Sequence, residues 1–352
     1  MIHVRKATAE DNQALQALQA RCPMGTTLVV STVNTPDFYG RARAYREHVV
    51  YAACRDDEIV GSAACALRKA VVGARVVPVG YEFQYFTSPD HRRDGVARAL
   101  HRHIEQHLQA SGAVLSYLVT IEGNEPALAL FKSQGFSLHR TLIMPGILVY
   151  KKMDEKSNGQ IRTATDDDLP QVAALANDTW RGHALYEPAT SASLAAFIER
   201  TPAFDAENLL ILERGKQIVA ALGFWDWSRI TRLTVHALGP RLRMLSGLLD
   251  VAGHVWRLPS GVHAGDTLTQ AVLTPVAYRT PADLAILVRR VNNLCLARGI
   301  GQIFTVCAQD HPMLDSLKGL ITLDSNLHVM VKPLAAGVAL DAGPVYLDGQ
   351  DL

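Results

Sequence analysis

Hydrophobic and polar positions follow a pattern that occurs twice along the chain. The segments VRKATAEDNQALQALQ, from Val4, and IRTATDDDLPQVAALA, from Ile161, each predict a short strand, a polar cap and an apolar helix face. Their acidic residues suit a helix N-terminus, because free N–H groups and the helix dipole favour negative charge there. The two copies begin 157 residues apart, at positions 4 and 161.

Two apolar runs, from Val49 and from Asn208, are each interrupted by a polar turn, at 55–58 and at 214–217. This pattern predicts one hairpin in each half of the chain. The hairpins follow the first repeat in the same order and at nearly the same offset. We therefore interpret the chain as a duplicated domain.

Two helical segments, from Ala97 and from Leu284, complete the repeat. Each ends at a glycine, Gly112 or Gly299, where a left-handed cap is needed. These glycines are 187 residues apart, at positions 112 and 299. The larger offset places an insertion in the second copy, between residues 231 and 265.

The order of elements predicts an α/β protein of two tandem domains, each a mixed, mostly antiparallel central sheet flanked by helices. The predicted units are a first domain over 1–152, a linker over 153–160, a second domain over 161–334 and a C-terminal tail over 335–352. The linker is polar and contains glycine. The tail is rich in Gly, Ala and Asp, and we expect it to wrap a surface.

Composition and charge exclude several classes of protein. The 352 residues are 48% hydrophobic, and 35 Lys and Arg balance 34 Asp and Glu, so neither nucleic acid nor a membrane is expected as a partner. The five cysteines lack CxxC spacing, which argues against a disulfide framework and a metal site. No signal-peptide pattern is present, and no apolar run reaches the roughly 20 residues that a membrane span requires. A cytoplasmic location is therefore expected.

The stretch with the clearest chemistry joins an aromatic strand, Tyr81–Thr87, to a helix that begins near Val96. Residues at spacing four give this helix one apolar face: Val96, Leu100, Ile104 and Leu108. A loop whose amides point inward at a helix N-terminus binds anions. Gly95 permits close backbone approach, and the small Ala97 leaves room for a phosphate oxygen.

This loop, Arg92-Arg93-Asp94-Gly95-Val96-Ala97, resembles the pyrophosphate loop of the GNAT N-acetyltransferase superfamily, Arg/Gln-x-x-Gly-x-Gly/Ala. The resemblance implies acetyl-CoA as co-substrate and no metal. Loop amides would hold the pyrophosphate, and the preceding strand would bond the pantetheine arm. The coenzyme A residues implied in this region are Tyr85, Phe86, Thr87, Arg92, Arg93, Asp94, Gly95, Val96, Ala97 and Arg98.

A second feature of that family follows downstream. A strand over 114–120 leads to Asn124 and to a helix that ends in Gly135-Phe136, which resembles the closing motif of GNAT domains. By this resemblance Asn124 would contact the pantetheine, and the helix would lie along the thioester. Many members have a tyrosine that protonates the departing thiolate where this chain has Phe131. Because a thiol with a pKa of about 8.5 leaves tolerably well, either water serves or the domain binds acyl-CoA without fast transfer.

The general base for an attacking amine is harder to assign. Family members often use a Glu on the fourth strand or a chain of waters, and Glu82 is the one carboxylate on this strand. Strand alternation places Glu82 on the same face as Gln84 and Phe86. The alternative is that Glu82 pairs with Arg75. The histidines at 101, 103 and 107 are expected on the polar face of the helix, without a metal role.

The segment Cys22–His48 occupies the variable acceptor region of the family. Its polar residues could select an acidic or polar acceptor: Asp37, Tyr39, Arg41, Arg43 and Arg46. The alternative is a solvated helix face. Cys22 has no base near it in sequence, so a buried structural thiol is favoured over a nucleophile.

The second copy lacks the features of the loop. Alignment on the two terminal glycines places Arg279 opposite Arg92, Ala282 opposite Gly95 and Leu284 opposite Ala97, and Pro281 removes an amide. The second domain is therefore expected to be a degenerate GNAT-like scaffold. Its aromatic residues are expected in the core or lining the acceptor site: Trp180, His183, Tyr186, Trp225 and Trp227.

Together these features predict an acyltransferase that moves an acetyl group from acetyl-CoA to a primary amine by direct attack. The acceptor would be a small-molecule amine or a protein amine, and a homodimer is compatible with the sequence. Two alternatives remain open: a non-catalytic acyl-CoA sensor, and acyl transfer to a thiol or a carrier protein.

Overall fold

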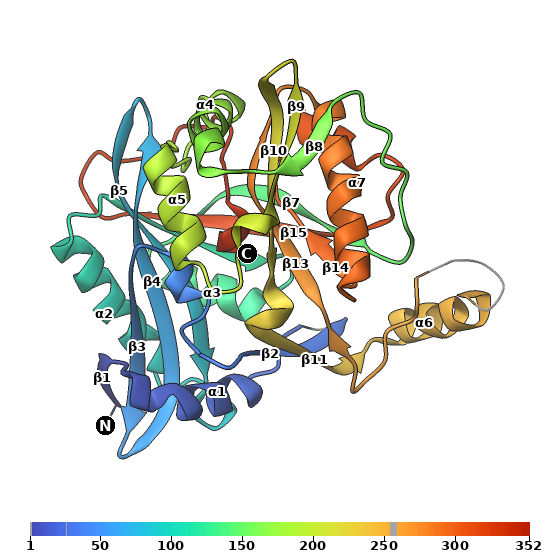
Figure 1. Ribbon diagram of the computed structural model, residues 1–352. Coiled ribbons are helices and arrows are strands. Elements are labelled where there is room, and N and C mark those ends of the chain that lie inside the picture. The colour runs from blue at the N-terminus through green and yellow to red at the C-terminus, as the bar shows by residue number, and fades with distance from the viewer. Residues whose placement is uncertain (1, 26, 254–258) are drawn as a thin grey trace.

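The computed structural model describes residues 2–25, 27–253 and 259–352. The first half of the chain contains β1 (Ile2–Lys6), α1 (Asn12–Ala20), β2 (Leu28–Asn34), β3 (Glu47–Arg55), β4 (Glu58–Val72), β5 (Arg75–Thr87), α2 (Val96–Ala110), β6 (Leu115–Ile121), α3 (Glu125–Ser133) and β7 (Ser137–Leu148). The second half contains β8 (Gln160–Thr163), α4 (Leu169–Thr179), α5 (Ser191–Arg200), β9 (Leu209–Arg214), β10 (Gln217–Asp226), β11 (Thr231–Leu238), α6 (Pro240–Gly253), β12 (Thr267–Leu268), β13 (Gln270–Tyr278), α7 (Pro281–Ala297), β14 (Gln302–Phe304) and β15 (Thr322–Pro333). Figure 1 shows their arrangement.

One 12-stranded sheet runs through both halves, in the order β1-β3-β4-β5-β6-β15-β7-β14-β13-β10-β9-β8. The order is mirrored about its centre, with five strands of one half on each side. Within each flank the strands are antiparallel except at one place, where β5 runs parallel to β6 and β13 runs parallel to β14. The predicted repeat is thus present as two copies of one strand arrangement.

The two halves exchange their last strands. β15 lies between β6 and β7 and pairs antiparallel with both, while β7 also pairs with β14. A cut at residue 152 would leave β7 without these neighbours. Each flank of the sheet is completed by a strand of the other half, so a boundary in sequence does not separate two complete sheets. The domain bounds taken from the sequence stay a prediction.

The turn between the first strand and the first helix of each copy is held by the same local contacts. Asp11 accepts the backbone N–H of Thr8 at 2.7 Å, and Asp168 accepts that of Thr165 at 2.8 Å, as in a capping box. An arginine of the preceding strand pairs with each carboxylate, at 2.7 Å for Asp11 and 2.6 Å for Asp168. These matched contacts confirm the duplication at the level of single hydrogen bonds.

Insertions from the two halves meet in a second, three-stranded sheet. β2, from the expected acceptor segment, pairs antiparallel with β11, and β11 pairs with β12. β11 and α6 occupy the insertion that the sequence placed between 231 and 265, and β12 follows directly after it. Figure 1 shows α6 extending away from the large sheet.

The start of the tail, 335–344, lies exposed or half-buried along the surface as expected, but its end is buried, contrary to the sequence-based expectation. Val345, Tyr346 and Leu347 are buried, and Asp351 is 2% exposed. Val345 forms a bridge to Ala184, so the tail enters between the two halves. Figure 1 shows the end of the chain near the centre of the molecule.

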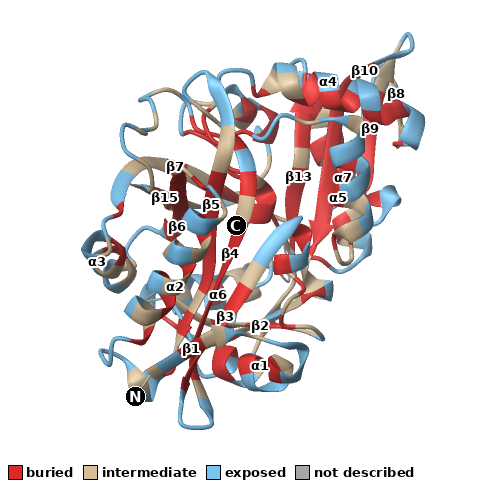
Figure 2. Ribbon diagram, turned by 90° about the vertical axis from the view of Figure 1, so that its left-hand side faces the viewer, coloured by how far each residue is buried: buried red, intermediate tan, exposed pale blue. Residues whose placement is uncertain are grey.

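Helices cover the sheet with their apolar faces. On α2 the predicted residues Val96, Leu100, Ile104 and Leu108 are all buried, against β3 and β4. Figure 2 shows the strands β4 and β13 as largely buried and the outer faces of the helices as exposed. Among the described residues, no helix is long and apolar enough to span a membrane.

The capping carboxylates make stability depend on acid pH. The hydrogen bond from Arg5 lowers the pKa of Asp11 to about 2, and the one from Arg162 lowers the pKa of Asp168 in the same direction. A depressed folded-state pKa stabilises the protein above the unfolded-state value of about 3.9, and that contribution is lost as the pH falls toward 2. We expect the free energy of unfolding, measured in urea, to fall between about pH 4 and pH 2.

Asp11→Asn should lower the free energy of unfolding at pH 7 by roughly 1–2 kcal/mol and flatten part of the acid slope. Asp57→Asn, at an exposed hairpin position, is the matched control and should change neither quantity. Equal effects of the two variants would contradict this account.

Candidate functional site

The site begins where two parallel strands separate. β5 and β6 pair from Val79 and Leu115 to Glu82 and Leu118, and the pairing then stops. The rest of β5, through Thr87, has no strand on that side among the described residues. Its N–H and C=O groups can therefore bond an extended ligand. In the large sheet β5 and β6 are the fourth and fifth strands of the first copy, and β5 is the strand that the family resemblance assigns to the pantetheine arm.

A bulge lies just beyond the last β5–β6 pair. The register between β4 and β5 shifts so that Ala63 faces both Gln84 and Tyr85, and Gln84 has φ +54°. The bulge breaks the strict alternation of side chains. Both amide atoms of Gln84 are buried and have no partner among the described residues.

The loop at the end of β5 presents an uncapped helix N-terminus. Gly95 is the N-cap of α2 with φ +84°, and no side chain caps the helix. A Cβ built on Gly95 would have no atom within 4 Å, so the space above the first turn is open. Val96 anchors the loop in the core and Ala97 is half-buried. The first N–H groups of α2 are thus free to bind an anion.

The charges around this helix end favour a phosphate ligand. Arg92, Arg93 and Arg98 are exposed and form no ion pair within the described parts of the chain. Asp94 would repel a phosphate, but its carboxylate pairs with Arg55 at 2.9 Å. The net field at the loop is therefore positive. These residues fit a pyrophosphate by the chemistry of their donors.

The helix α3 forms the other side of the opening. Asn124 caps α3 by accepting the N–H of Ala127 at 3.3 Å. Phe131 is buried, and its ring meets the ring of Tyr85 edge-on at 5.1 Å. Tyr85 and Phe131 are thus brought together, whereas Phe86 packs on the opposite side of the sheet against Leu18.

Glu82 lies in a closed hydrogen-bond network. The alternative prediction that it pairs with Arg75 is wrong. Ser116 donates to it at 2.6 Å, His101 lies 3.0 Å away, and the Tyr85 hydroxyl also donates to it. No bond to Arg75 is present. Because of the bulge, Glu82 shares its face with Tyr85, whereas the sequence placed it with Gln84 and Phe86.

His101 corrects a second expectation, because it is 2% exposed rather than on the polar face of α2. Its other ring nitrogen lies 3.3 Å from Lys332 of β15, which pairs with Glu105 at 2.7 Å. Burial raises the pKa of the Tyr85 hydroxyl well above its ordinary value, and the nearby Glu82 adds to that rise. Tyr85 is therefore a protonated donor at neutral pH.

Comparisons with known proteins identify the family of the first copy and the fold of the chain. The model of the acetyltransferase (GNAT) family matches residues 13–136. Residues 13–136 therefore form a domain of the GNAT family. No curated protein matches the chain in sequence.

Solved structures extend the likeness of fold to the whole chain. Saccharomyces cerevisiae N-myristoyltransferase with bound myristoyl-CoA has a TM-score of 0.66 and 11% identity over 98% of this chain and 85% of that one. A GCN5-related N-acetyltransferase from Anabaena variabilis has a TM-score of 0.54 and 13% identity over 95% of this chain and 73% of that one. A probable N-acyltransferase from Enterococcus faecalis has a TM-score of 0.51 and 10% identity over the same shares. The fold is therefore that of GNAT acyltransferases with a tandem arrangement.

In the second GNAT-like copy, α7 corresponds to α2, and its N-terminus is capped by a side chain. α7 has 17 residues and α2 has 15, so α7 begins earlier than the sequence alignment implied. Its N-cap is Thr280, whereas the alignment placed Ala282 opposite Gly95, the N-cap of α2. Thr280 caps the helix by accepting the N–H of Asp283 at 3.2 Å, and Asp283 is itself paired with Arg214. A buried carboxylate and a filled cap leave no anion site there.

The open strand edge is also filled in the second copy. β13 and β14 part after Val272 and Phe304, as β5 and β6 do. The indole of Trp180 then donates to the carbonyl of Val276 at 2.7 Å, and its ring stacks on His311 at 5.2 Å. Trp180 and Trp225 are core residues, while Trp227 is half-buried.

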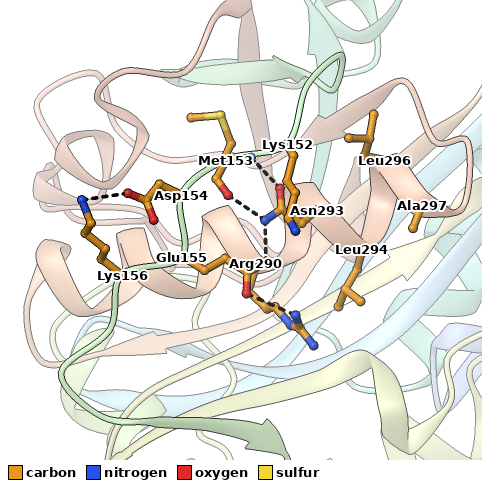
Figure 3. Close-up of a pocket in the computed structure, with 10 residues that line it drawn as sticks. All are labelled: Lys152, Met153, Asp154, Glu155, Lys156, Arg290, Asn293, Leu294, Leu296 and Ala297. Atoms are coloured by element: carbon orange, nitrogen blue, oxygen red, sulfur yellow. Dashed lines mark hydrogen bonds and ion pairs between the residues drawn. The ribbon is translucent and has the colours of Figure 1, made fainter.

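Two open pockets lie away from the first-copy cleft. One, of about 650 Å³, lies beside α4 and the start of α7, next to Tyr278 and His311. The other, of about 950 Å³, lies between the linker and α7. Figure 3 shows Asn293 bonded to both backbone groups of Met153, at 2.7 and 2.9 Å, so this pocket is formed by the docking of the linker. The described parts of the chain contain no group of three or more His, Cys, Asp or Glu that could hold a metal.

The acceptor segment does not form a helix face. Arg43 pairs with Asp37 at 2.9 Å, Arg46 is exposed and Tyr39 bonds the carbonyl of Thr8. Cys22 is buried, and burial raises the pKa of its thiol although Arg92 and Arg21 lower it. A nucleophilic role for Cys22 is thus disfavoured. Arg41 alone among the arginines of this segment turns inward.

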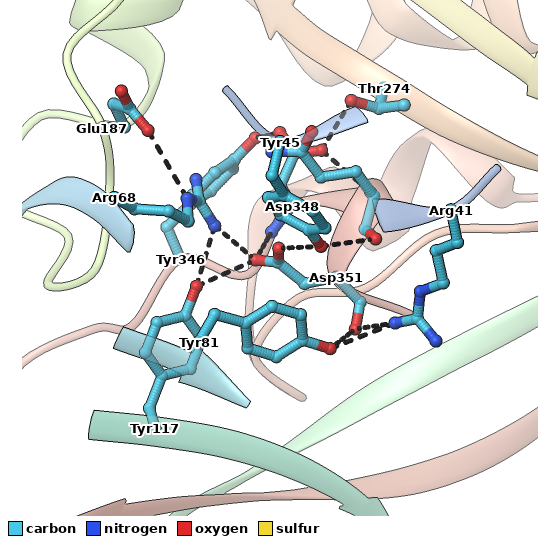
Figure 4. A network of polar contacts seen from close by, with 11 residues as sticks. Arg41, Tyr45, Arg68, Tyr81, Tyr117, Glu187, Thr274, Tyr346, Asp348 and Asp351 are labelled. Carbon is cyan, nitrogen blue, oxygen red and sulfur yellow. Dashed lines mark hydrogen bonds and ion pairs between the residues drawn. The ribbon is translucent and has the colours of Figure 1, made fainter. Parts of the chain in front are cut away.

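A buried polar network that the sequence did not reveal joins the tail to the first copy. Arg68 pairs with Asp351 at 2.7 Å and donates to Tyr117 at 2.8 Å, and Tyr45 donates to Asp351 at 2.8 Å. Figure 4 shows these side chains gathered around Asp351. Burial raises the pKa of the Asp351 carboxyl, and the charge of Arg68 and the hydrogen bond from Tyr45 oppose that rise. No local pattern identifies this network, because its members come from distant parts of the chain.

The assignment of an anion site to the N-terminus of α2 can be tested with a matched pair of glycine variants. Gly95 and Gly112 both have positive φ, at +84° and +77°, and a Cβ on either meets nothing within 4 Å. Gly95→Glu should weaken acetyl-CoA binding, measured by calorimetry, by roughly 100-fold or more, because it places a carboxylate beside phosphate. Gly112→Glu carries the same backbone strain and should bind like the wild type. Equal affinities of the two variants would contradict the assignment.

Proposed function

We propose that the protein is an N-acyltransferase that moves an acetyl group from acetyl-CoA to a primary amine. The observation that carries this proposal is the uncapped, positively charged N-terminus of α2 at the end of the open edge of β5. Helix and strand edge together suit a ligand with a pyrophosphate at one end and an extended amide arm. Arg92, Arg93 and Arg98 supply charge, and Val96 and Ala97 supply amides.

The cofactor residues implied by the family pattern take separate roles in this proposal. The backbone of Tyr85, Phe86 and Thr87 bonds the pantetheine arm, and Asn124 closes the other side. Binding of the pyrophosphate, at a distance from the reacting atoms, supplies the energy that holds the thioester near the bulge at Gln84. Backbone N–H groups there polarise the carbonyl.

The chemical step is a direct displacement. The neutral amine nitrogen attacks the thioester carbon, a C–N bond forms, and the C–S bond breaks to release coenzyme A as a thiolate. The amine proton must leave, and the thiolate must gain one. No acyl-enzyme is needed, which agrees with the buried state of Cys22.

Glu82 is proposed as the proton acceptor, acting through Tyr85. The carboxylate is enclosed, so it does not reach an amine directly. The Tyr85 oxygen can accept the amine proton while its own proton passes to Glu82. Tyr85 also lies against Phe131, at the position where many family members carry a tyrosine. Because the Tyr85 proton passes to Glu82, water supplies the proton that the thiolate gains, in place of the missing hydroxyl of Phe131.

The direct test of the function is acyl transfer followed by the release of coenzyme A thiol. The purified protein would receive acetyl-CoA or a longer acyl-CoA, with a panel of amines and with thiol acceptors. We expect amine-dependent release that is fastest with acetyl-CoA. Binding of acetyl-CoA with no turnover of any acceptor would contradict the enzyme proposal and favour a non-catalytic sensor. Faster release of coenzyme A with thiols than with amines would favour a thiol as the acceptor.

The proton relay makes a specific kinetic prediction. Tyr85→Phe should lower kcat by roughly 100-fold, which is the usual contribution of general base catalysis. The affinity for acetyl-CoA should stay unchanged, because the backbone that bonds the cofactor remains. Tyr51→Phe, on β3 against α2, removes a hydroxyl away from the cleft and serves as the control. A kcat within threefold of the wild type in Tyr85→Phe would rule out the relay.

A further inference from the structure

Arg41 is held in the interior between the two halves of the protein. Its Nη2 donates to the Tyr81 hydroxyl and to the carbonyl of Asp351, both at 3.1 Å. Its guanidinium lies 5.2 Å from the ring centre of Phe83 and 5.4 Å from that of Trp227. Figure 4 shows the other terminal nitrogen of Arg41 directed away from the network around Asp351.

The contact between Arg41 and Trp227 contains donors without acceptors. Arg41 Nε and Trp227 Nε1 are both buried, and neither has a hydrogen-bond partner among residues 2–25, 27–253 and 259–352. Arg41 also forms no ion pair with a described residue. Both groups can only donate. Buried donors without partners are costly, so this place favours a ligand that brings acceptor oxygens.

The position of this contact links it to the acyl-transfer cleft. Phe83, on which Arg41 lies, directly follows the last paired residue of β5, Glu82. The next residue is Gln84, whose amide is also buried without a described partner. Arg41 comes from the first copy and Trp227 from the second. The two halves therefore meet at this contact, on the face of β5 opposite to Glu82 and Tyr85 and beside the point where β5 and β6 part.

A carboxylate is the acceptor group that fits these donors. Nη2 of Arg41 already donates to Tyr81 and Asp351, so Nε and the other terminal nitrogen are the donors left for a carboxylate of opposite charge. An indole N–H supplies a third donor of fixed direction. A neutral carbonyl would satisfy fewer donors and would bring no charge opposite to that of Arg41.

We propose that the acceptor is an amine that carries a carboxylate, as an amino acid does, and that Arg41 and Trp227 bind that carboxylate. This proposal rests on the proposed N-acyltransferase function and adds the class of acceptor. Arg41 and Trp227 are specificity residues, since neither takes part in the chemical step.

The test uses binding of product analogues, so it does not depend on turnover. The full-length protein would first be titrated with coenzyme A, which reports on the cofactor site separately. The loaded protein would then be titrated by calorimetry with N-acetylglycine, N-acetylleucine and N-acetylglutamate, and with the carboxamide of each. At least one acid should bind at least 10-fold more tightly than its carboxamide.

Variants separate the two donors from the general fold. Trp227→Phe keeps an aromatic ring but removes the N–H, and it should weaken the binding of the acid by roughly 10-fold while the carboxamide is unaffected. Arg41→Gln should abolish the preference for the acid. Arg43→Gln is the matched control, because Arg43 is exposed and pairs with Asp37. Coenzyme A should bind all three variants like the wild type.

The outcomes separate the two proposals. Failure of coenzyme A to bind the wild type would overturn the proposed function itself. Binding of coenzyme A with no preference for any acid over its carboxamide, or with no binding of either, would overturn the carboxylate site alone. An acid preference that survives both Trp227→Phe and Arg41→Gln would also overturn it.

Discussion

The exchange of the last strands between the two copies is the constraint on which the rest of the structure depends. β15 fills the edge of β6, and β7 fills the edge of β14, so neither half has a complete sheet alone. With its far edge held by β15, β6 can part from β5 without exposing a second unpaired edge. The cleft in the first copy is therefore supported by a strand from the second.

The same exchange brings residues of the second half into the first-copy site. Lys332, on β15, reaches Glu105 and His101 and so closes the network that holds Glu82. The tail that follows β15 runs back between the halves, where Asp351 meets Arg68. The second copy has a capped helix end where the first has an open one, but it positions groups around Glu82. This gives a physical reason for a degenerate copy to be retained.

Local signals in the sequence predicted the local structure well. The capping sequences at Thr8 and Thr165, the hairpin turns and the start of α2 at Val96 are all set by residues close together in the chain. The fold class followed from their order. The loop at Gly95 was recognisable because an uncapped helix N-terminus needs small residues at fixed positions.

The remaining features depend on contacts between distant residues and gave no local signal. The bulge at Gln84 changes which residues share a face with Glu82, and alternation alone does not reveal it. The strand exchange and the buried tail join segments hundreds of residues apart. Arg41 was one of several arginines in a polar segment, and only its packing between Phe83 and Trp227 distinguishes it.

The central claim is that one copy binds the cofactor at the open β5 edge and at the start of α2, while the other copy cannot. Amide hydrogen exchange, compared with and without saturating acetyl-CoA, tests this claim directly. Protection should increase over residues 85–98 and around Asn124, and it should not change over the matching segment 276–284. Increased protection over 276–284, or no change over 85–98, would contradict the account.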